Sequence, residues 1–536
     1  MVNNKKNNIT NTMVSQGLIL IIANIIVRFF GFIYRIPLTD MLGDSGNGIY
    51  SASFNVYYFF LLISSASMPA VISKLVSERT ALKQYKDAHN VYKVAYFISG
   101  TLGFLCMLIL FFNADKVEDL LYTEGTALSI KVLAPTVFCV SLLSVYRGYF
   151  QGLKNTIPTA ISQVVEQIVN AIVSLIGAYY LVKISVAHGA AGSTLGTLFG
   201  AFSGLIVVFI IYLSKRKFIM KKVSKSFASE SYISLGKQIL KTSIPIILGT
   251  TIFAITNIID TRMSMSRLTA SGVFTYDEAV SLYGQLTGKF LVLTNLPISI
   301  ATVFSASVIP NISSMRIAKK KKDINKNINL AIKMVMIFAV PATFGMVILA
   351  KEIYAFLYPS YPAGYTLMYL GGISIIIISF NQVIVSILQG LDRLYLPLIS
   401  TLVSVIIKIT LNYFLISIPS INIHGAVIST VVSYMVFLIL DLYFLKRVWT
   451  VKIKYKSVFL KPLIASVIMG IVCFFTNKAI FFIFKSNAIA LIMSVIISMF
   501  VYFIILITIR SITDKDILRI PKGYLILKIL QKIKII

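Results

Sequence analysis

The sequence is poor in charged residues and in cysteine. Asp, Glu, Lys and Arg make up 13% of its 536 residues and apolar residues 57%, whereas a soluble domain carries roughly 25% charged residues. A soluble protein is therefore excluded. The three cysteines, Cys106, Cys139 and Cys473, lie far apart in apolar runs, which argues against a disulfide framework and a cysteine-based metal site. The connections between apolar runs are short, so a soluble catalytic domain is not expected either.

Apolar runs long enough to span a membrane recur along the whole chain. A helix needs about 20 such residues to cross a hydrocarbon core roughly 30 Å thick. We therefore predict an all-α integral membrane protein with about 14 transmembrane helices. No cleavage site follows the basic start, so the first helix is expected to stay in the mature protein. The predicted spans are residues 15–36, 51–73, 93–112, 129–149, 158–182, 190–213, 240–261, 281–309, 329–350, 365–389, 396–417, 424–445, 459–480 and 487–509.

The net charge of +31 is distributed in a way that points to a membrane rather than to nucleic acid. Lysines and arginines gather at both termini and in every second loop, as in residues 74–93, 215–241, 316–333 and 446–461, whereas loops such as 115–124 are acidic. This alternation follows the positive-inside rule. It predicts a multi-pass protein of the cytoplasmic membrane with both termini in the cytoplasm. The tail 514–536, which mixes lysines with Ile and Leu, is expected to form an amphipathic helix at the inner interface.

Two motifs recur in the same order. Gln151-Gly152-Leu153 returns as Gln389-Gly390-Leu391, and His188-Gly189-Ala190 returns as His424-Gly425-Ala426. Two halves with the same orientation imply a parallel repeat, an architecture typical of transporters. We therefore predict two pseudo-symmetric six-helix lobes around a central cavity, with an N-lobe at 1–228, a C-lobe at 229–450, and two extra helices plus the basic tail at 451–536.

The repeated histidines and turns allow a functional and a structural interpretation. His188 and His424 suggest a metal or proton relay, but each begins a span beside glycine, which favours a cap or interfacial role. The Gln-Gly-Leu turns precede a proline-started helix and are expected to hold a tight loop.

Six of the charged residues within predicted spans stand out as functional candidates, because a charge inside a bilayer is costly. They are Arg28, Arg35, Glu166, Asp260, Lys289 and Lys408. Arg28 is too central to reach an interface, whereas Arg35 lies near the outer end and anchoring is an equal alternative. Seven residues make about two helical turns, so both arginines share a face and would form a cationic stripe if that face lines the cavity.

The other four candidates allow alternatives. Glu166 and Asn170, with Gln163 and Gln167, follow helical spacing and predict a polar stripe on the fifth span. A buried carboxylate is costly, so Glu166 is expected to pair with an arginine or to titrate. Asp260 lies in NIIDTRMSMSR beside two arginines, and both an ion pair and a cation-coupling site stay open, as a coupling role does for Glu166.

Lys289 and Lys408 are either substrate-binding residues or helix-end lysines that reach for headgroups. Together the six candidates carry four positive and two negative charges. Excess positive charge in a cavity favours an anionic substrate, because Arg and Lys bind phosphates through charge-assisted hydrogen bonds.

The run GFIYRIPLTDMLGDSGNGIYSASFNVYYFFLLISSASMPAVISKLVSER resembles the opening of the stage V sporulation protein B and YtgP-type polysaccharide transporters. IPTAISQVVEQIVN and LPISIATVFSASVIPNIS are also similar to this group, which belongs to the multidrug/oligosaccharidyl-lipid/polysaccharide flippase superfamily. The resemblance covers essentially the whole chain. It implies two six-helix lobes with two extra helices. It also implies outward movement of an undecaprenyl-pyrophosphate-linked cell-wall precursor by alternating access, as in MurJ-like lipid II flippases.

The resemblance also implies arginines that engage the diphosphate of the substrate. Arg28 stands where the first family arginine is expected, and Arg35 matches the next with a shift of one residue. The family's second-helix arginine has no counterpart, since that region offers Asn55 and Tyr57. In the eighth helix, Lys289 stands about one turn before the expected position.

Three functions follow for comparison. The first is a flippase or exporter of a lipid-linked oligosaccharide such as a lipid II-like precursor. The second is a multidrug or cation antiporter of the same superfamily. The number of spans and the positive charge of the interior argue against this function. The third is a membrane-embedded glycosyltransferase or polymerase, which needs acidic residues at one membrane face and a sizeable loop. For the first, we expect no enzyme activity, cofactor, metal or nucleic acid, a monomer in contact with membrane lipids, and an unidentified coupling ion, H⁺ or Na⁺.

Overall fold

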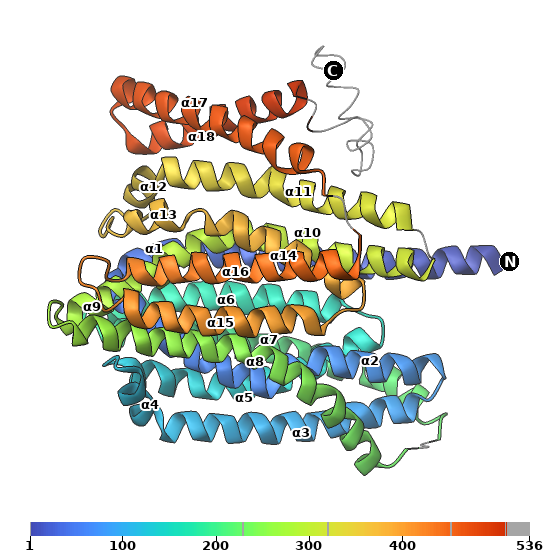
Figure 1. The fold of residues 1–536 in the computed structure, drawn as a ribbon. Helices are drawn as coiled ribbons and strands as arrows, with labels where there is room; N and C mark the ends of the chain where they lie inside the picture. The colour runs from blue at the N-terminus through green and yellow to red at the C-terminus, as the bar shows by residue number, and fades with distance from the viewer. Residues whose placement is uncertain (1, 228–229, 319–320, 451–452, 510, 512–536) are drawn as a thin grey trace. The chain divides into compact units, whose positions relative to one another are not determined.

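The computed structural model describes residues 2–511 except 228–229, 319–320, 451–452 and 510, and these residues fold almost entirely into helices (Figure 1). The chain divides into two compact units, one that ends at Gly284 and one that begins at Gln285. The first unit contains α1 (Val2–Leu61), the π-helical turn η1 (Leu62–Ala66), α2 (Met68–Ala81), α3 (Tyr85–Phe112), α4 (Ala114–Leu121), α5 (Thr126–Gly152), α6 (Ile157–Leu181), α7 (Val186–Val223), α8 (Tyr232–Ala270) and α9 (Tyr276–Gly284).

The second unit is also helical in the residues described. α10 packs on α14, α15 on α16, and α17 on both α11 and α18. Its elements are the π-helical turn η2 (Gln285–Phe290), α10 (Leu291–Ile317), α11 (Lys321–Ile348), α12 (Ala350–Leu357), α13 (Tyr365–Gly371), α14 (Ser374–Gly390), α15 (Tyr395–Leu415), α16 (His424–Val448), the π-helical turn η3 (Lys456–Leu460), α17 (Lys461–Phe484) and α18 (Asn487–Thr508).

Twelve helical stretches among the described residues are long and apolar enough to cross a membrane, and α13 with α14, bent by 49°, adds a thirteenth. The stretch Ala23–Ala81 has 59 residues, which at 1.5 Å per residue is about three times the thickness of a hydrocarbon core. It contains most of the first predicted span and all of the second, and every other predicted segment overlaps one of these stretches to within a few residues at its ends. The expectation of an all-α, multi-pass membrane protein is confirmed. The predicted amphipathic tail lies outside the described residues.

The kink that separates the first two spans depends on one glycine. Gly43 has φ 65° and ψ −177°, a combination that is essentially restricted to glycine because a Cβ would clash with the backbone. The blue ribbon therefore crosses the unit from the N-terminus and returns toward α2 (Figure 1). Beyond the kink α1 packs closely on α9, where a Cβ at Gly48 would lie 2.9 Å from a side-chain carbon of Val280.

The compact units do not divide the chain at the predicted lobe boundary. α8 follows residue 228 but belongs to the first unit, where it contacts α1, α3 and α4, and α9 contacts α1 and α8. The boundaries predicted from the repeat therefore remain a prediction about the lobes.

The two Gln-Gly-Leu turns have the same backbone conformation. Lys154 and Asp392, which follow the leucines, have φ of 59° and 64°. The amide of Lys154 donates to the carbonyl of Gln151, and the amide of Asp392 donates to that of Gln389, both at 2.9 Å. The turns thus hold tight loops, as expected from the sequence.

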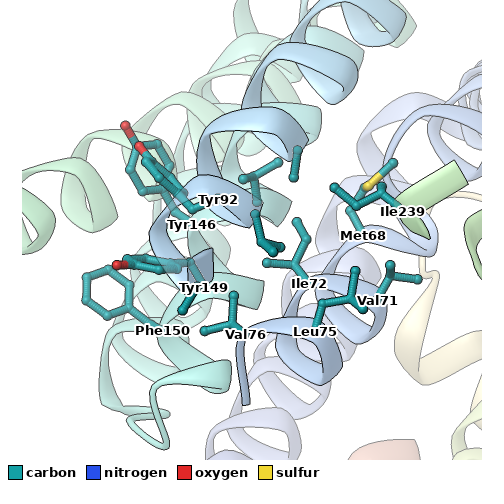
Figure 2. Close-up of a cluster of buried hydrophobic side chains, with 14 of the residues drawn as sticks. Met68, Val71, Ile72, Leu75, Val76, Tyr92, Tyr146, Tyr149, Phe150 and Ile239 are labelled. Carbon is teal, nitrogen blue, oxygen red and sulfur yellow. The ribbon is translucent and has the colours of Figure 1, made fainter. Parts of the chain in front are cut away.

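A cluster of buried apolar side chains stabilises the first unit where α2, α3, α5 and α7 meet near the Gln-Gly-Leu turn. Tyrosines of α3, α5 and α7 pack on one another, with the rings of Tyr92 and Tyr149 centred 4.8 Å apart and those of Tyr92 and Tyr212 5.4 Å apart. Ten members are labelled in Figure 2: Met68, Val71, Ile72, Leu75, Val76, Tyr92, Tyr146, Tyr149, Phe150 and Ile239.

Candidate functional site

The polar stripe of α6 is held by close packing on α7. Glycines recur every four residues along α7, and a Cβ at Gly200 would lie 2.7 Å from the carbonyl oxygen of Glu166. Small residues at this spacing let two membrane helices approach to backbone contact. The hydroxyl of Ser174 lies 2.7 Å from the carbonyl oxygen of Ser193 and 2.9 Å from the amide oxygen of Asn170, so its single proton is donated to one or shared between both. α6 is therefore fixed, and its polar residues are held in position.

Glu166 pairs with an arginine, one of the two outcomes expected for it. The Nη2 atom of Arg147 on α5 lies 2.6 Å from the Glu166 carboxylate, and Nε of Arg147 donates to Ser162 at 3.0 Å. The two side chains are 14% and 29% exposed. Arg147 was not singled out in the sequence, although it precedes Glu166 by 19 residues across one tight loop. This separation in sequence is compatible with two antiparallel helices, so the sequence contained enough information to predict the pair.

The arginine face of α1 lies against the polar face of α6. Gly31 lies between Arg28 and Arg35 on this face, and a Cβ there would be 3.4 Å from Nε2 of Gln167. The neighbouring Tyr34 lies close to Asn170. The structure thus brings together the cationic and polar stripes that the sequence predicted separately.

The guanidinium of Arg35 is held in place but keeps a free donor. Its central carbon lies 4.5 Å from the centre of the Tyr50 ring, a cation–π contact. Its Nε is buried and has no hydrogen-bond partner among the described residues. Because the side chain as a whole is partly exposed, the charge of the positioned guanidinium is suited to attract an anion. Arg28, two turns earlier, is exposed.

Asn55 occupies the region where the resemblance implies an arginine, and it belongs to a buried polar cluster. Its amide donates to the hydroxyls of Thr261 and Tyr283 at 3.1 and 3.2 Å, and these two hydroxyls are 2.7 Å apart. Asp260, adjacent to Thr261, is half-buried. Arg262 is directed elsewhere, with its guanidinium 5.5 Å from the ring of Tyr122. The two alternatives for Asp260, an ion pair and a coupling site, both stay open.

The second unit contains Lys289 and Lys408. Lys289 is 1% exposed, and its ammonium donates to the carbonyls of Tyr361 and Ala363 at 2.5 and 3.1 Å. This arrangement holds a loop and favours a structural role over both alternatives taken from the sequence. Lys408 is half-buried on α15, one turn before the buried Asn412. Substrate binding by either lysine remains a prediction.

The repeated histidines act at helix starts. Nδ1 of His188 lies 2.9 Å from the hydroxyl of Ser185, which also accepts the backbone amide of His188 and so caps α7. Nε2 of His424 lies 2.9 Å from the hydroxyl of Thr366. Within the part of the chain described, no group of three metal-ligating side chains occurs. The Ser185 contact supports the cap interpretation for the His188 helix, whereas the His424 contact joins the start of α16 to α13.

One buried carboxylate was overlooked in the sequence. Asp441 on α16 is 0% exposed, and no cation lies within ion-pair distance of it among the described residues. Its polar neighbour is Ser400 on α15. The sequence alone could have identified Asp441 as a candidate, because it is a carboxylate inside the predicted span 424–445.

Comparison with known proteins identifies the family. The profile of the polysaccharide biosynthesis protein family matches residues 13–316, more than half of the chain. The chain belongs to this family. Two similar proteins come from Bacillus subtilis (strain 168). Lipid II flippase MurJ is 27% identical, in an alignment that covers 84% of this chain and 86% of the relative. Stage V sporulation protein B is 26% identical, in an alignment that covers 95% of this chain and 98% of the relative.

Solved structures share the fold of this chain. Lipid II flippase MurJ in an inward closed conformation aligns with a TM-score of 0.64 and 15% identity over 94% of this chain and all of that one. An inward-facing multidrug resistance MATE family transporter aligns with a TM-score of 0.68 and 15% identity over 79% and 94%. The two-lobed transporter architecture and the resemblance drawn from the sequence motifs are confirmed.

Proposed function

We propose that this protein is a flippase that moves an undecaprenyl-pyrophosphate-linked cell-wall precursor or polysaccharide unit across the cytoplasmic membrane by alternating access. The names of its relatives support this function, since they include lipid II flippases and a probable low-salt glycan biosynthesis flippase of Haloferax volcanii. In this proposal the protein works as a monomer, has both termini in the cytoplasm and forms no covalent intermediate with its substrate. The driving force is an H⁺ or Na⁺ gradient, the membrane potential or consumption of the product on the outer side, and these three alternatives stay open.

The observation that carries the proposal is the Arg35 guanidinium, which Tyr50 holds by a cation–π contact on a side chain that is partly exposed. A pyrophosphate presents several acceptor oxygens, and a planar guanidinium binds two of them at once. Tyr50 fixes the position of the cation, so little side-chain entropy is lost on binding. Arg28 supplies a second charge two turns along the same face, and the neutral polar residues of α6 face the sugar or phosphate oxygens.

The charge balance of this face also supports an anionic cargo. Glu166 carries the negative charge of the α6 stripe, and Arg147 already neutralises it at 2.6 Å. Glu166 is therefore already paired within the α5–α6 hairpin, and we propose that the arginines of α1 give this face a net positive charge. A cationic drug would meet repulsion there, which weighs against a multidrug antiporter even though the MATE transporters share the fold.

The test is transport in proteoliposomes that contain a fluorescent undecaprenyl-pyrophosphate oligosaccharide, with the outer leaflet read by a membrane-impermeant quencher. Arg35→Ala and Arg28→Ala are expected to slow movement about tenfold or more each, because a hydrogen bond to a charged group contributes about 1.5–3 kcal/mol. Arg35→Lys keeps the positive charge but loses the paired N–H donors of the guanidinium, so an intermediate transport rate is expected.

Lys183→Ala is the matched control. Its ammonium also lies 4.5 Å from a tyrosine ring, that of Tyr179, but at the far end of α6. It should transport at the wild-type rate. The proposal fails if wild type moves no such lipid, or if Arg35→Ala and Arg28→Ala both match Lys183→Ala. Export of a cationic dye by wild type in a parallel assay would instead favour the multidrug antiporter.

A further inference from the structure

A cavity of about 400 Å³ lies in the first unit, away from the arginine face of α1. It is walled by α2, α3, α5, α7 and the first Gln-Gly-Leu turn, at the lysine-rich end of the unit, which the distribution of charge predicts to be cytoplasmic. Its volume falls within the range of sites for small ligands, about 300–1,000 Å³. Nothing in the proposed flippase mechanism uses this cavity.

The charged residues that line the cavity are both lysines. Lys215 and Lys222 of α7 contribute to its wall, and the lining contains no Asp or Glu. They are seven residues apart and so share one face of the helix. Neither forms an ion pair with a described residue. Lys222 lies 4.6 Å from the ring of Phe218 and 5.7 Å from that of Tyr85, so aromatic rings hold its ammonium at the wall.

The opposite wall is rigid and partly apolar. Tyr149 and Phe150 are each 1% exposed and belong to the packed cluster in Figure 2. His89 lies 3.3 Å from the hydroxyl of Tyr149 and links it to α3. The turn adds Asn155, whose backbone amide already donates to the carbonyl of Phe150 at 3.0 Å. Its side-chain amide adds a hydrogen-bonding group to the wall of the cavity.

The second copy of the repeat uses the equivalent turn differently. There Arg316 of α10 donates to the carbonyl of Leu391 at 2.5 Å and pairs with Asp392 at 3.1 Å. The helix that matches α7 is also shorter: α16 has 25 residues and α7 has 38. The lysines of the cavity lie in the part of α7 that extends past the repeated length. The cavity is thus a feature of one copy and not a general consequence of the fold.

We propose that this cavity binds a phosphate ester, with the phosphate between Lys215 and Lys222 and an adjoining apolar or ring-shaped portion against Tyr149 and Phe150. Two lysines without carboxylate partners form charge-assisted hydrogen bonds to phosphate oxygens. The side-chain amide of Asn155 donates to a further oxygen. This chemistry is offered by the headgroup of an anionic phospholipid and by a soluble phosphate ester.

Binding to the full-length protein in nanodiscs separates the two sources. One arm uses phosphatidylcholine discs with increasing phosphatidylglycerol, read as bound lipid by native mass spectrometry. The other uses phosphatidylcholine discs titrated with glycerol 3-phosphate and with adenosine monophosphate, read by calorimetry. Saturable binding in the first arm alone would identify the ligand as a lipid headgroup. Saturable binding in the second arm alone would identify it as a soluble phosphate ester. Binding in both arms would show that the site recognises the phosphate ester group that the two share. Absence of saturable binding in both arms overturns the proposal.

Matched variants separate the cavity from general surface charge. Lys215→Gln with Lys222→Gln is expected to weaken saturable binding about tenfold or more. Lys217→Gln with Lys221→Gln removes the same charge from exposed positions of the same helix outside the cavity, and should change the affinity less than about twofold. Ser214→Trp fills the cavity without changing the charge and should abolish binding. Equal losses in both double variants would show diffuse attraction and refute the site. Melting temperatures close to wild type show that each variant is folded.

Discussion

The Arg147–Glu166 ion pair allows a quantitative test of how the first unit is stabilised. Its atoms are 2.6 Å apart, and the two side chains are 14% and 29% exposed. Exposed pairs contribute about 0.2–1 kcal/mol, and removal of one partner of a buried pair costs about 3–5 kcal/mol. Because this pair is partly buried, we expect Glu166→Ala to lower the free energy of unfolding by about 2–3 kcal/mol.

The two single variants should differ in a definite order. Glu166→Ala leaves the guanidinium of Arg147 without its partner, and Arg147 is the more buried of the two. Arg147→Ala leaves a carboxylate that water reaches more easily, so it should cost less. The double variant should lose less than the sum, with a coupling free energy of about 1–2 kcal/mol.

The assay is a double-mutant cycle on unfolding by denaturant in detergent micelles. Lys131 and Asp115 serve as a control cycle in the same unit, because their atoms are 2.9 Å apart but the side chains are 37% and 72% exposed. Their coupling should be below about 0.5 kcal/mol. The reasoning is refuted if the Arg147–Glu166 coupling does not exceed that of the control, or if Arg147→Ala is the more destabilising single change.

Three further changes test the packing and the buried charges. Gly200→Leu should lower the free energy of unfolding by about 3 kcal/mol or more, because its Cβ would lie 2.7 Å from the carbonyl of Glu166, whereas Gly249→Leu, with no atom within 4 Å of its Cβ, should change it by less than about 1 kcal/mol. Lys289→Met should cost about 2–4 kcal/mol and speed proteolysis of the loop 358–364, because two carbonyls lose their donor; unchanged proteolysis would argue against this role. Asp441→Asn should alter the same free energy by less than about 1 kcal/mol, because a buried carboxyl without a cation partner gains little from a charge; a loss above about 2 kcal/mol would indicate an ionised, paired carboxylate.

The membrane helices could be predicted from the sequence because their signal is carried by composition alone. Each predicted span overlaps a membrane-spanning helical stretch of the structure over most of its length. The join between the first two was not predicted, because it depends on the φ of 65° at Gly43, which hydropathy does not encode. The extension of α7 past the membrane was missed for a related reason, since a lysine-rich segment is compatible with both a loop and an exposed helix.

Parts of the candidate site depend on packing and left no pattern in the sequence. The spacing of Glu166 and Asn170 predicted the polar face of α6, and the need for a counter-charge predicted an arginine. Lys289 differs, because its partners are backbone carbonyls more than 70 residues away, and every residue has a carbonyl. Asp441 needed no structure to be found, since a carboxylate inside an apolar run is visible directly.

The two copies of the repeat have diverged in how they use the same backbone. Both turns place the residue after leucine at positive φ, so the conformation is common. In the second unit an arginine closes its turn, whereas in the first the turn borders a cavity with two lysines. The arginine face of α1 also belongs to the first unit, while Lys289 of the second is bound to its own loop. The arginine face of α1 and the cavity, where we propose that anionic groups bind, therefore both belong to the first unit.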